Sequence, residues 1–194
     1  MKVAAIENDK YLIRPVTDTD KVPFMRIRKE NSDMSRAYDN KMFFDYLWAA
    51  VLRSRDEVSM VVFLKENGSL IAVCSFRDVN TGAISIGIDL DTSMQSGGTG
   101  TEILSLLVSY LKKNTDQKIL TRTKSNNLPC QKMIIRAGGI KISEDKTEFE
   151  CLVEDMIPSL EKDGLSKKAS EARNMLNWRR GIFVNTYEFC REGQ

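Results

Sequence analysis

The chain has 194 residues, of which 42% are hydrophobic and 29% charged, values that are ordinary for one globular domain with a sizeable core. The formal net charge of +2 is too small to indicate nucleic acid or an anionic membrane as the main partner. Histidine is absent, which excludes Ser–His and Cys–His nucleophilic mechanisms and nearly all zinc catalysis.

Residues 11–14 are predicted to form a short strand that Pro15 ends. Thr17 and Asp20 stand at capping-box spacing, with Asp in place of the usual Glu, and predict a helix over residues 22–30. Asp39 or Asn40 is expected to cap a second helix. Its wide apolar face consists of two adjacent i,i+4 rows: Phe43, Leu47 and Val51, then Phe44, Trp48 and Leu52.

Three strands are predicted in succession over residues 58–64, 70–76 and 84–90, because tight turn signals separate them at Asn67-Gly68 and Thr81-Gly82. Together they form an antiparallel meander. In the third strand isoleucine and leucine alternate with Ser85, Gly87 and Asp89, which indicates one buried face.

A glycine-rich turn follows this strand and leads into a helix. The turn reads Gln95-Ser96-Gly97-Gly98-Thr99-Gly100. The helix is indicated by apolar residues at helical spacing, namely Ile103, Leu104, Leu107, Val108 and Leu111. Such a junction offers backbone N–H groups and the positive end of a helix dipole to an anion, typically a phosphate.

Residues 118–123 are predicted to form a strand parallel to the strand over residues 84–90, since a helical crossover joins them. A short helix with Pro129 in its first turn follows, and Gly138-Gly139 ends it. Residues 140–143 and 147–153 are then predicted to form a hairpin, because Phe149, Cys151 and Val153 alternate along one face.

The pattern changes after Glu154. A narrow apolar stripe predicts an amphipathic helix, with Leu165, Ala169, Ala172 and Leu176 as its members. Residues 182–189 are predicted to form a strand or a packed terminal arm. We therefore expect a main domain over residues 1–154 and an extension over residues 155–194, which covers the sheet, makes a dimer contact or forms a lid.

The cysteines and the hydropathy pattern indicate a cytoplasmic protein. Cys74, Cys130, Cys151 and Cys190 lie in apolar surroundings and lack the short spacing of metal ligands, which favours reduced, buried thiols. No segment approaches the roughly 18 apolar residues that a membrane span needs. We expect no metal, no nucleic acid and no membrane as partners.

The strand, glycine-rich turn and helix resemble the acetyl-coenzyme A signature of the GNAT acyltransferases, Gln/Arg-x-x-Gly-x-Gly/Ala, with Gln95 to Gly100 at its positions. Downstream, the segment from Asn127 to Met133 is similar to the second motif of that family, in which an asparagine opens a short helix that ends at a glycine pair. The resemblance covers residues 11–153 in the family's order of elements and leaves the extension outside.

This resemblance implies an α/β fold of the mixed α+β type, with a mixed, mostly antiparallel sheet flanked by helices. It also implies acetyl-coenzyme A as the cofactor and direct transfer of the acetyl group to a primary amine. The residues that it implicates in cofactor binding are Leu90, Gln95, Ser96, Gly97, Gly98, Thr99, Gly100, Thr101, Asn127 and Lys132.

The catalytic positions depart from the family pattern. Many members carry a glutamate as general base near the position of Ser85, and many carry a tyrosine as general acid where this chain has Ile134. Asp89 and Ser85, which share a strand face, are therefore the predicted catalytic residues, with Asp89 as the remaining candidate base. Ser125, Cys130 and Tyr110 are weaker candidates for the acid, and a chain of water molecules is an alternative to all three.

The acceptor is expected to be a small-molecule or peptide amine bound against the first two helices, where Asp33, Asp39 or Asp45 could hold a cationic group. A catalytically silent binder of acyl-coenzyme A, acting as a sensor or partner-binding module, is the alternative function. A structural protein that assembles through its extension is a third, and self-association into a homodimer is left open.

Overall fold

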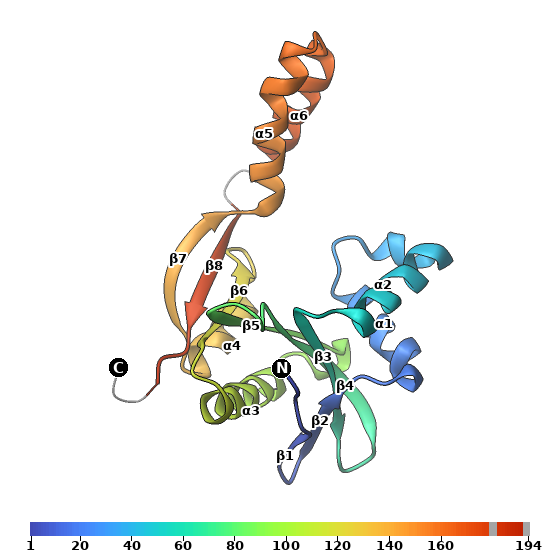
Figure 1. The fold of residues 1–194 in the computed structure, drawn as a ribbon, viewed down its shortest axis with the longest axis vertical. Coiled ribbons are helices and arrows are strands. Elements are labelled where there is room, and N and C mark those ends of the chain that lie inside the picture. Colours follow the sequence, from blue (N-terminus) through green and yellow to red (C-terminus); the bar gives the residue numbers. More distant parts are fainter. Residues whose placement is uncertain (179–181, 192–194) are drawn as a thin grey trace.

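The computed structural model describes residues 1–178 and 182–191, without the side chains of residues 148, 149, 177 and 178. A mixed sheet of eight strands forms its centre, in the order β1-β2-β3-β4-β5-β6-β8-β7 (Figure 1). The strands are β1 (Ile6–Glu7), β2 (Tyr11–Pro15), β3 (Glu57–Leu64), β4 (Ser69–Arg77), β5 (Ala83–Leu90), β6 (Lys118–Lys124), β7 (Ile140–Lys146) and β8 (Phe183–Glu188). Neighbouring strands are antiparallel except β5 and β6, which confirms the predicted mostly antiparallel sheet.

Six α-helices lie between the strands: α1 (Lys21–Glu30), α2 (Lys41–Arg53), α3 (Thr99–Asn114), α4 (Leu128–Arg136), α5 (Glu148–Lys162) and α6 (Ser166–Trp178), as counted over the described residues. Short 3₁₀ turns precede three of them: η1 (Asp18–Asp20), η2 (Ser35–Asp39) and η3 (Thr92–Met94). Of the two predicted caps of the second helix, Asp39 and Asn40, the structure has Asn40, whose side chain accepts a hydrogen bond from the Phe43 amide at 3.1 Å. Strand β1 was not predicted from the sequence, because two residues are too few to make a pattern.

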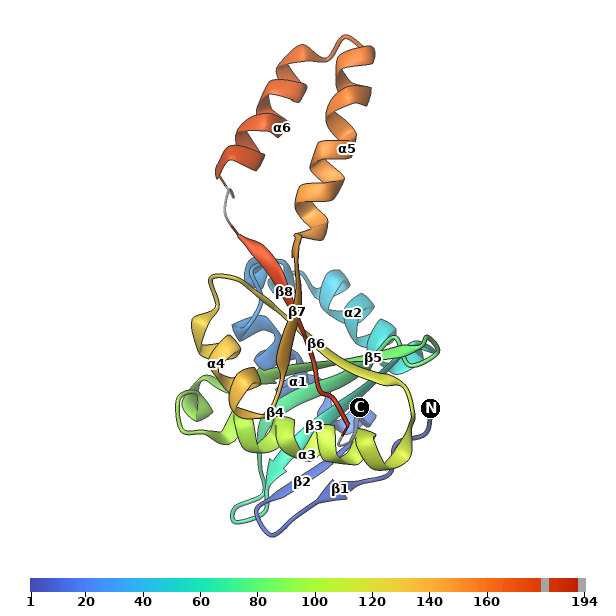
Figure 2. The ribbon, with the colours of Figure 1, turned by 90° about the vertical axis from the view of Figure 1, so that its left-hand side faces the viewer.

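The helices cover both faces of the sheet, as the alternation of its strands requires. On one face α1 and α2 pack Phe24 and Trp48 against Val61 and Val73. On the other face α3 and α4 cover a larger core that includes Ile84, Ile86, Ile103, Leu107 and Ile134. Figures 1 and 2 show α1 and α2 on the opposite side of the sheet from α3.

The prediction of a strand over residues 147–153 is wrong, because these residues enter α5 instead. Thr147 and Glu150 form a capping box at its start, with the Thr147 hydroxyl accepting from the Glu150 amide at 3.2 Å. The apolar alternation of Phe149, Cys151 and Val153, which predicted the strand, lies in the first turns of this helix. The position between residues 154 and 155, where we expected the main domain to end, lies inside this helix.

The α5–α6 hairpin connects β7 to β8 in the chain and projects away from the sheet (Figures 1 and 2). Chain order places α5 and α6 after β7, and β8 then returns along the sheet between β6 and β7. The amphipathic helix predicted around Ala169 and Ala172 is confirmed as α6, and both side chains are buried. The predicted strand or arm over residues 182–189 is a strand of the sheet itself.

Among the described residues, each helix is too short or too polar to cross a lipid bilayer.

Candidate functional site

A cleft begins where β5 and β6 separate. These strands pair in parallel only as far as Ile86 and Thr121 in the described chain, and the Thr121 hydroxyl donates to the Ile86 carbonyl at 2.9 Å. β5 continues to Leu90 while still paired with β4. Residues 87–90 therefore present one edge of β5 to a gap rather than to a neighbouring strand. The cleft at this gap has a volume of about 770 Å³.

The glycine-rich turn forms one wall of the cleft, directly before α3. Its backbone follows the left-handed region at Ser96 (φ 76°) and at Gly98 (φ 86°). Gly98 is the N-cap of α3, and its carbonyl accepts from the Glu102 amide at 3.1 Å. The first-turn amides of α3 have no partner within the helix, so the turn and the helix start form a cradle for an anion.

Gly98 and Gly100 are glycines for different reasons. A Cβ at Gly98 would meet open space, but the left-handed backbone there disfavours most side chains. A Cβ at Gly100 would lie 2.6 Å from Sδ of Met133 and 3.1 Å from Cδ1 of Leu90. Gly100 therefore allows α3 to approach α4 and β5 closely, a packing reason that the sequence did not reveal.

Most of the residues implicated by the sequence lie together along this cleft. The lining includes Asp89, Leu90, Gln95, Ser96, Gly98, Gly100, Thr101, Asn127 and Lys132. Gly97 and Thr99 belong to the same turn but are not among the lining residues, and Thr99 is buried. The Asn127 side chain accepts from the Cys130 amide at 3.1 Å, so it caps α4 at the rim of the cleft.

The predicted catalytic residue Ser85, and Ile134 at the position of the family's tyrosine, lie away from the cleft. Ser85 is 4% exposed and sits in the paired part of β5, between Arg77 of β4 and Leu120 of β6. Ile134 is fully buried in the core beneath α4. In this fold, therefore, neither side chain lines the cleft in which Asp89 lies.

Several lining residues were not singled out from the sequence, among them Arg136, Met133 and Asn31. Arg136 follows Lys132 by one helical turn on α4, so both cations share a face, and this i,i+4 spacing was a readable signal. Met133 fills the space beside Gly100. Asn31 donates from Nδ2 to the carbonyls of Leu90 and Ile27, each at 2.9 Å, and so ties α1 to the end of β5.

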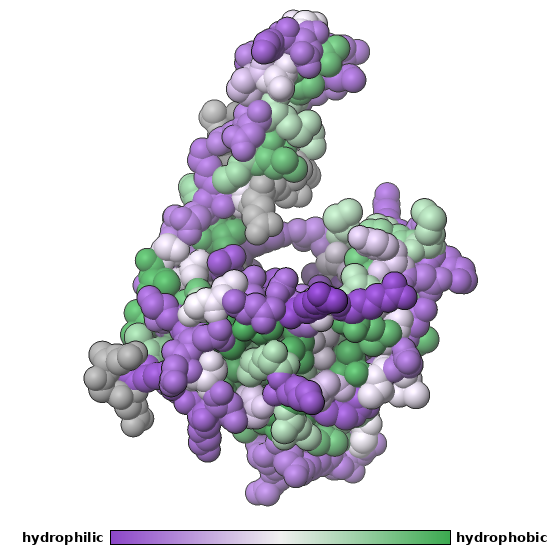
Figure 3. Space-filling model, in the orientation of Figure 1, coloured by the Kyte–Doolittle hydropathy of each residue, from purple (hydrophilic) through white to green (hydrophobic). Residues whose placement is uncertain are grey.

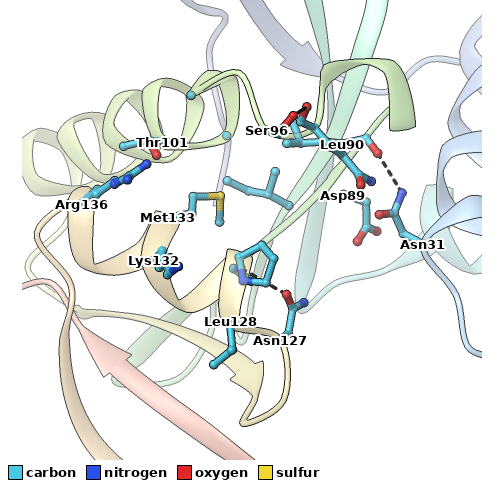
Figure 4. Close-up of a pocket in the computed structure, with 16 residues that line it drawn as sticks. Asn31, Asp89, Leu90, Ser96, Thr101, Asn127, Leu128, Lys132, Met133 and Arg136 are labelled. Atoms are coloured by element: carbon cyan, nitrogen blue, oxygen red, sulfur yellow. Dashed lines mark hydrogen bonds between the residues drawn. The ribbon is translucent and has the colours of Figure 1, made fainter.

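The cleft has a cationic end and an end that contains a carboxylate. Figure 4 shows Arg136 and Thr101 at one end, Asp89 and Asn31 at the other, and Met133 between them. A long ligand with anionic groups at the helix start would reach the carboxylate with its other end.

Asp89 occupies an unusual environment for an acidic side chain. Burial raises its pKa above the ordinary value, and the nearby guanidinium groups of Arg28 and Arg77 only partly oppose this. Arg28 donates to Oδ2 at 2.9 Å, and among the described residues no donor to Oδ1 is present. A carboxylate with a raised pKa and a free oxygen is suited to accept a proton.

Asp91 offers a contrast two residues further along the chain. Hydrogen bonds from Ser93 and the guanidinium of Arg26 lower its pKa to about 2. It caps η3 and is not among the residues that line the cleft.

Two of the weaker candidates for the general acid, Cys130 and Tyr110, differ in their position relative to the cleft. Cys130 lines the cleft, and burial raises the pKa of its thiol, so it is a weak acid there. Tyr110 lies outside the lining, where its ring stacks on Phe76 with 6.2 Å between centroids. In the described part of the chain no group of His, Cys, Asp and Glu side chains is arranged to hold a metal ion.

Comparison with protein families gives one match, to a model described as an acetyltransferase (GNAT) domain, over residues 10–140. A search of curated protein sequences returns no significant match.

Several solved structures share the fold at low sequence identity. RimL, a ribosomal L7/L12 α-N-protein acetyltransferase solved in complex with coenzyme A, superposes with a TM-score of 0.68 at 12% identity, over 98% of this chain and 100% of its own. The ribosomal-protein-S5-alanine acetyltransferase of Vibrio fischeri gives 0.60 at 19% identity, over 75% and 88%.

A spermidine N-acetyltransferase chimera, SpeG of Vibrio cholerae with segments of hSSAT, gives a TM-score of 0.61 at 16% identity, over 71% of this chain and 85% of its own. At these identities the likeness concerns the fold alone.

Proposed function

This chain belongs to the GNAT acetyltransferase family, and we propose that it transfers an acetyl group from acetyl-coenzyme A to a primary amine. The observation that carries the proposal is the separation of β5 from β6 directly beside the glycine-rich start of α3. This places an anion cradle, an unpaired strand edge and the Asp89 carboxylate along one cleft.

The residues present fit coenzyme A. Its pyrophosphate would lie on the turn from Ser96 to Thr101, where the helix start supplies N–H groups. Lys132 and Arg136 face this end of the cleft and add positive charge for the phosphates. The unpaired edge of β5, over residues 87–90, offers backbone groups to the amide-containing arm of the cofactor.

Bound acetyl-coenzyme A supplies an activated thioester, and the protein supplies orientation and proton transfer. In the transfer a bond forms between the amine nitrogen and the acetyl carbon, the carbon–sulfur bond breaks, and its electron pair leaves with the sulfur. The amine must lose a proton, and we assign its acceptance to Asp89, directly or through water. N–H groups of the unpaired β5 edge stabilise the negative charge that develops on the acetyl oxygen.

Release of free thiol from acetyl-coenzyme A, measured across a panel of amines, tests this function. Asp89→Asn is expected to lower kcat by about 100-fold or more, the usual contribution of a general base. Asp91→Asn is the matched control, because it removes an arginine-paired carboxylate from the same strand end without touching the cleft. A wild-type rate in Asp89→Asn would reject the role of this carboxylate.

A catalytically silent binder of acyl-coenzyme A is the second candidate, favoured by the burial of Ser85 and Ile134 away from the cleft. It predicts cofactor binding without turnover of any amine above the rate of hydrolysis. Thiol release with at least one amine, accompanied by the mass of the acetylated product, would exclude it.

A further inference from the structure

Arg77, the last residue of β4, extends diagonally across β5. A Cβ at Gly87 would lie 2.9 Å from Nη2 of Arg77 and 3.0 Å from Oγ of Ser75. The register pairs Arg77 with Ser85, so Gly87 is the diagonal neighbour that a long side chain can reach. The guanidinium thus lies over a position of β5 where the absence of a side chain makes room for it.

Among the described residues, no carboxylate forms an ion pair with this guanidinium. Glu57 is its direct partner in the β3–β4 register, yet the Glu57 carboxylate accepts from the Ser59 hydroxyl at 3.1 Å and makes no ion pair with Arg77. Other arginines of the same region are paired, Arg26 with Asp91 and Arg28 with Asp89. Arg77 is therefore available to a ligand on this sheet face, as is the exposed Arg122 of β6.

Arg77 also lies close to the proposed proton acceptor. Gly87 and Asp89 are two residues apart on one face of β5, which separates them by roughly 7 Å. The positive charge of Arg77 acts on Asp89, where it opposes the effect of burial on the pKa. An ammonium beside Asp89 and an anionic group beside Arg77 would thus be only a few atoms apart.

α1 and α2 cover only part of this face of the sheet, and another part is open to solvent. Figure 3 shows an opening, bordered by hydrophilic side chains, between the column formed by β7, β8 and the α5–α6 hairpin and the lobe formed by α1 and α2. Arg77, on this face, is exposed. An acceptor can therefore approach Asp89 from the side opposite α3.

We propose that the acceptor is a small amine that carries a carboxylate, such as an amino acid, and that Arg77 binds this carboxylate. The inference rests on the proposed function and names its substrate class. A guanidinium forms paired, charge-assisted hydrogen bonds with a carboxylate, and this fork geometry makes it selective for planar anions. A polyamine would instead meet repulsion from Arg77 and Arg28.

Calorimetric titration of the full chain with L-amino acids and their matched carboxamides, with and without saturating coenzyme A, tests the subsite. Because coenzyme A carries no acetyl group, binding is measured without turnover. At least one amino acid is expected to bind about tenfold or more tightly than its carboxamide. Equal affinity within every pair, or no binding by any amino acid, would overturn the proposal.

Two variants test whether Arg77 causes the tighter binding of amino acids than of their carboxamides. Arg77→Gln is expected to abolish this difference in affinity, with the affinity for carboxamides unchanged. Gly87→Ala is expected to weaken it without unfolding the protein, because the added methyl displaces only the flexible end of Arg77 and the Ser75 hydroxyl. Lys113→Gln, the same charge change on the opposite side of the sheet, is expected to have no effect. Retention of the preference in Arg77→Gln would contradict the assignment.

The acetyl transfer and the carboxylate subsite at Arg77 can each be rejected without rejecting the other. If amino acids bind with the expected preference but no amine releases thiol, the subsite stands and the acetyl transfer is rejected. If thiol is released with neutral amines and with carboxamides as readily as with amino acids, the transfer stands and the subsite is rejected.

Discussion

Two aspartates, the buried Asp20 and the half-buried Asp89, each contact an arginine and have pKa values shifted in opposite directions. Asp20 accepts two hydrogen bonds from Arg14, at 2.7 and 2.8 Å, and one from the Thr17 amide at 2.7 Å. The Arg14 hydrogen bond is the main reason that its pKa is lowered. Asp89 has fewer donors, and burial raises its pKa. The first pattern stabilises the fold, whereas the second leaves a carboxylate available for chemistry.

Asp20→Asn is expected to lower the free energy of unfolding by about 1–3 kcal/mol at pH 7, because it breaks a charge-assisted network around η1. A carboxyl whose pKa is lower in the folded state stabilises the protein above its unfolded pKa of about 4 and loses that contribution as the pH falls through the folded pKa. Urea unfolding between pH 3 and 7 checks this.

Asp45→Asn is the control for Asp20. The pKa of Asp45 is lowered to about 2 by Lys21 and Lys41, but its side chain is 41% exposed, so its ion pairs stabilise little. Equal losses of stability in the two variants would show that the buried network around Asp20 stabilises the fold no more than the exposed ion pairs of Asp45.

Asp89→Asn is expected to change stability in the opposite sense. A carboxyl whose pKa is raised in the folded state contributes stability below its unfolded pKa and loses it as the pH rises through the folded pKa. The melting temperature of the variant relative to wild type should therefore be higher at pH 8 than at pH 4. Thermal unfolding at both values tests this, and a relative loss at pH 8 would contradict the raised pKa.

At the scale of single residues, the sequence predicted most of the cleft lining but not the pairing of its charges. Arg28 and Asn31 come from α1 and its C-cap, far along the chain from Asp89 and Leu90, and Arg77 comes from β4, the strand paired with β5. Their contacts depend on how α1 packs over the sheet and on the diagonal reach of Arg77, and no local spacing encodes either.

At the scale of elements, the strongest predictions were those with a local physical cause. Asn40 as a helix cap, the meander of β3, β4 and β5, and the glycine-rich entry to α3 follow from side-chain chemistry within a few residues. The start of α5 has such a signal too, in the spacing of Thr147 and Glu150, whereas the apolar alternation beside it predicts a strand that does not form. For short segments, a capping pair is thus the better guide.

Gly98→Asp and Gly98→Asn separate charge from backbone strain in the anion cradle. Both side chains tolerate a left-handed backbone better than most and are nearly equal in size, and a Cβ at Gly98 meets open space. Asp is expected to weaken acetyl-coenzyme A binding at least about tenfold more than Asn, because its charge faces the phosphates. Calorimetry measures both, and equal affinities would argue against a pyrophosphate at this turn.

At the scale of the whole molecule, β8 was the least predictable part. It lies between β6 and β7 although the α5–α6 hairpin separates it from β7 in the sequence. Its Tyr187 is buried in the main core, and Phe189 follows it there. Such long-range pairing is determined by the tertiary fold rather than by local pattern, so the strand was foreseen and its place in the sheet was not.

Removal of the α5–α6 hairpin is expected to leave the sheet and cofactor binding intact. Lys146 and Phe183 are opposite each other at the end of the β7–β8 ladder, so an Asn-Gly turn can replace residues 147–182. Circular dichroism and acetyl-coenzyme A titration check this. Truncation before residue 183, which deletes β8, is the contrasting variant and should unfold. Loss of cofactor binding without loss of fold in the hairpin deletion would assign the hairpin a part in the cleft.

The central claim is that the cleft between β5, α3 and α4 binds acetyl-coenzyme A. Calorimetric titration of the full-length wild-type chain with acetyl-coenzyme A tests this most directly. We predict a saturable heat with one cofactor bound per chain at micromolar concentrations. The absence of binding at millimolar cofactor would contradict the claim, and with it both the acetyltransferase and the silent-binder functions.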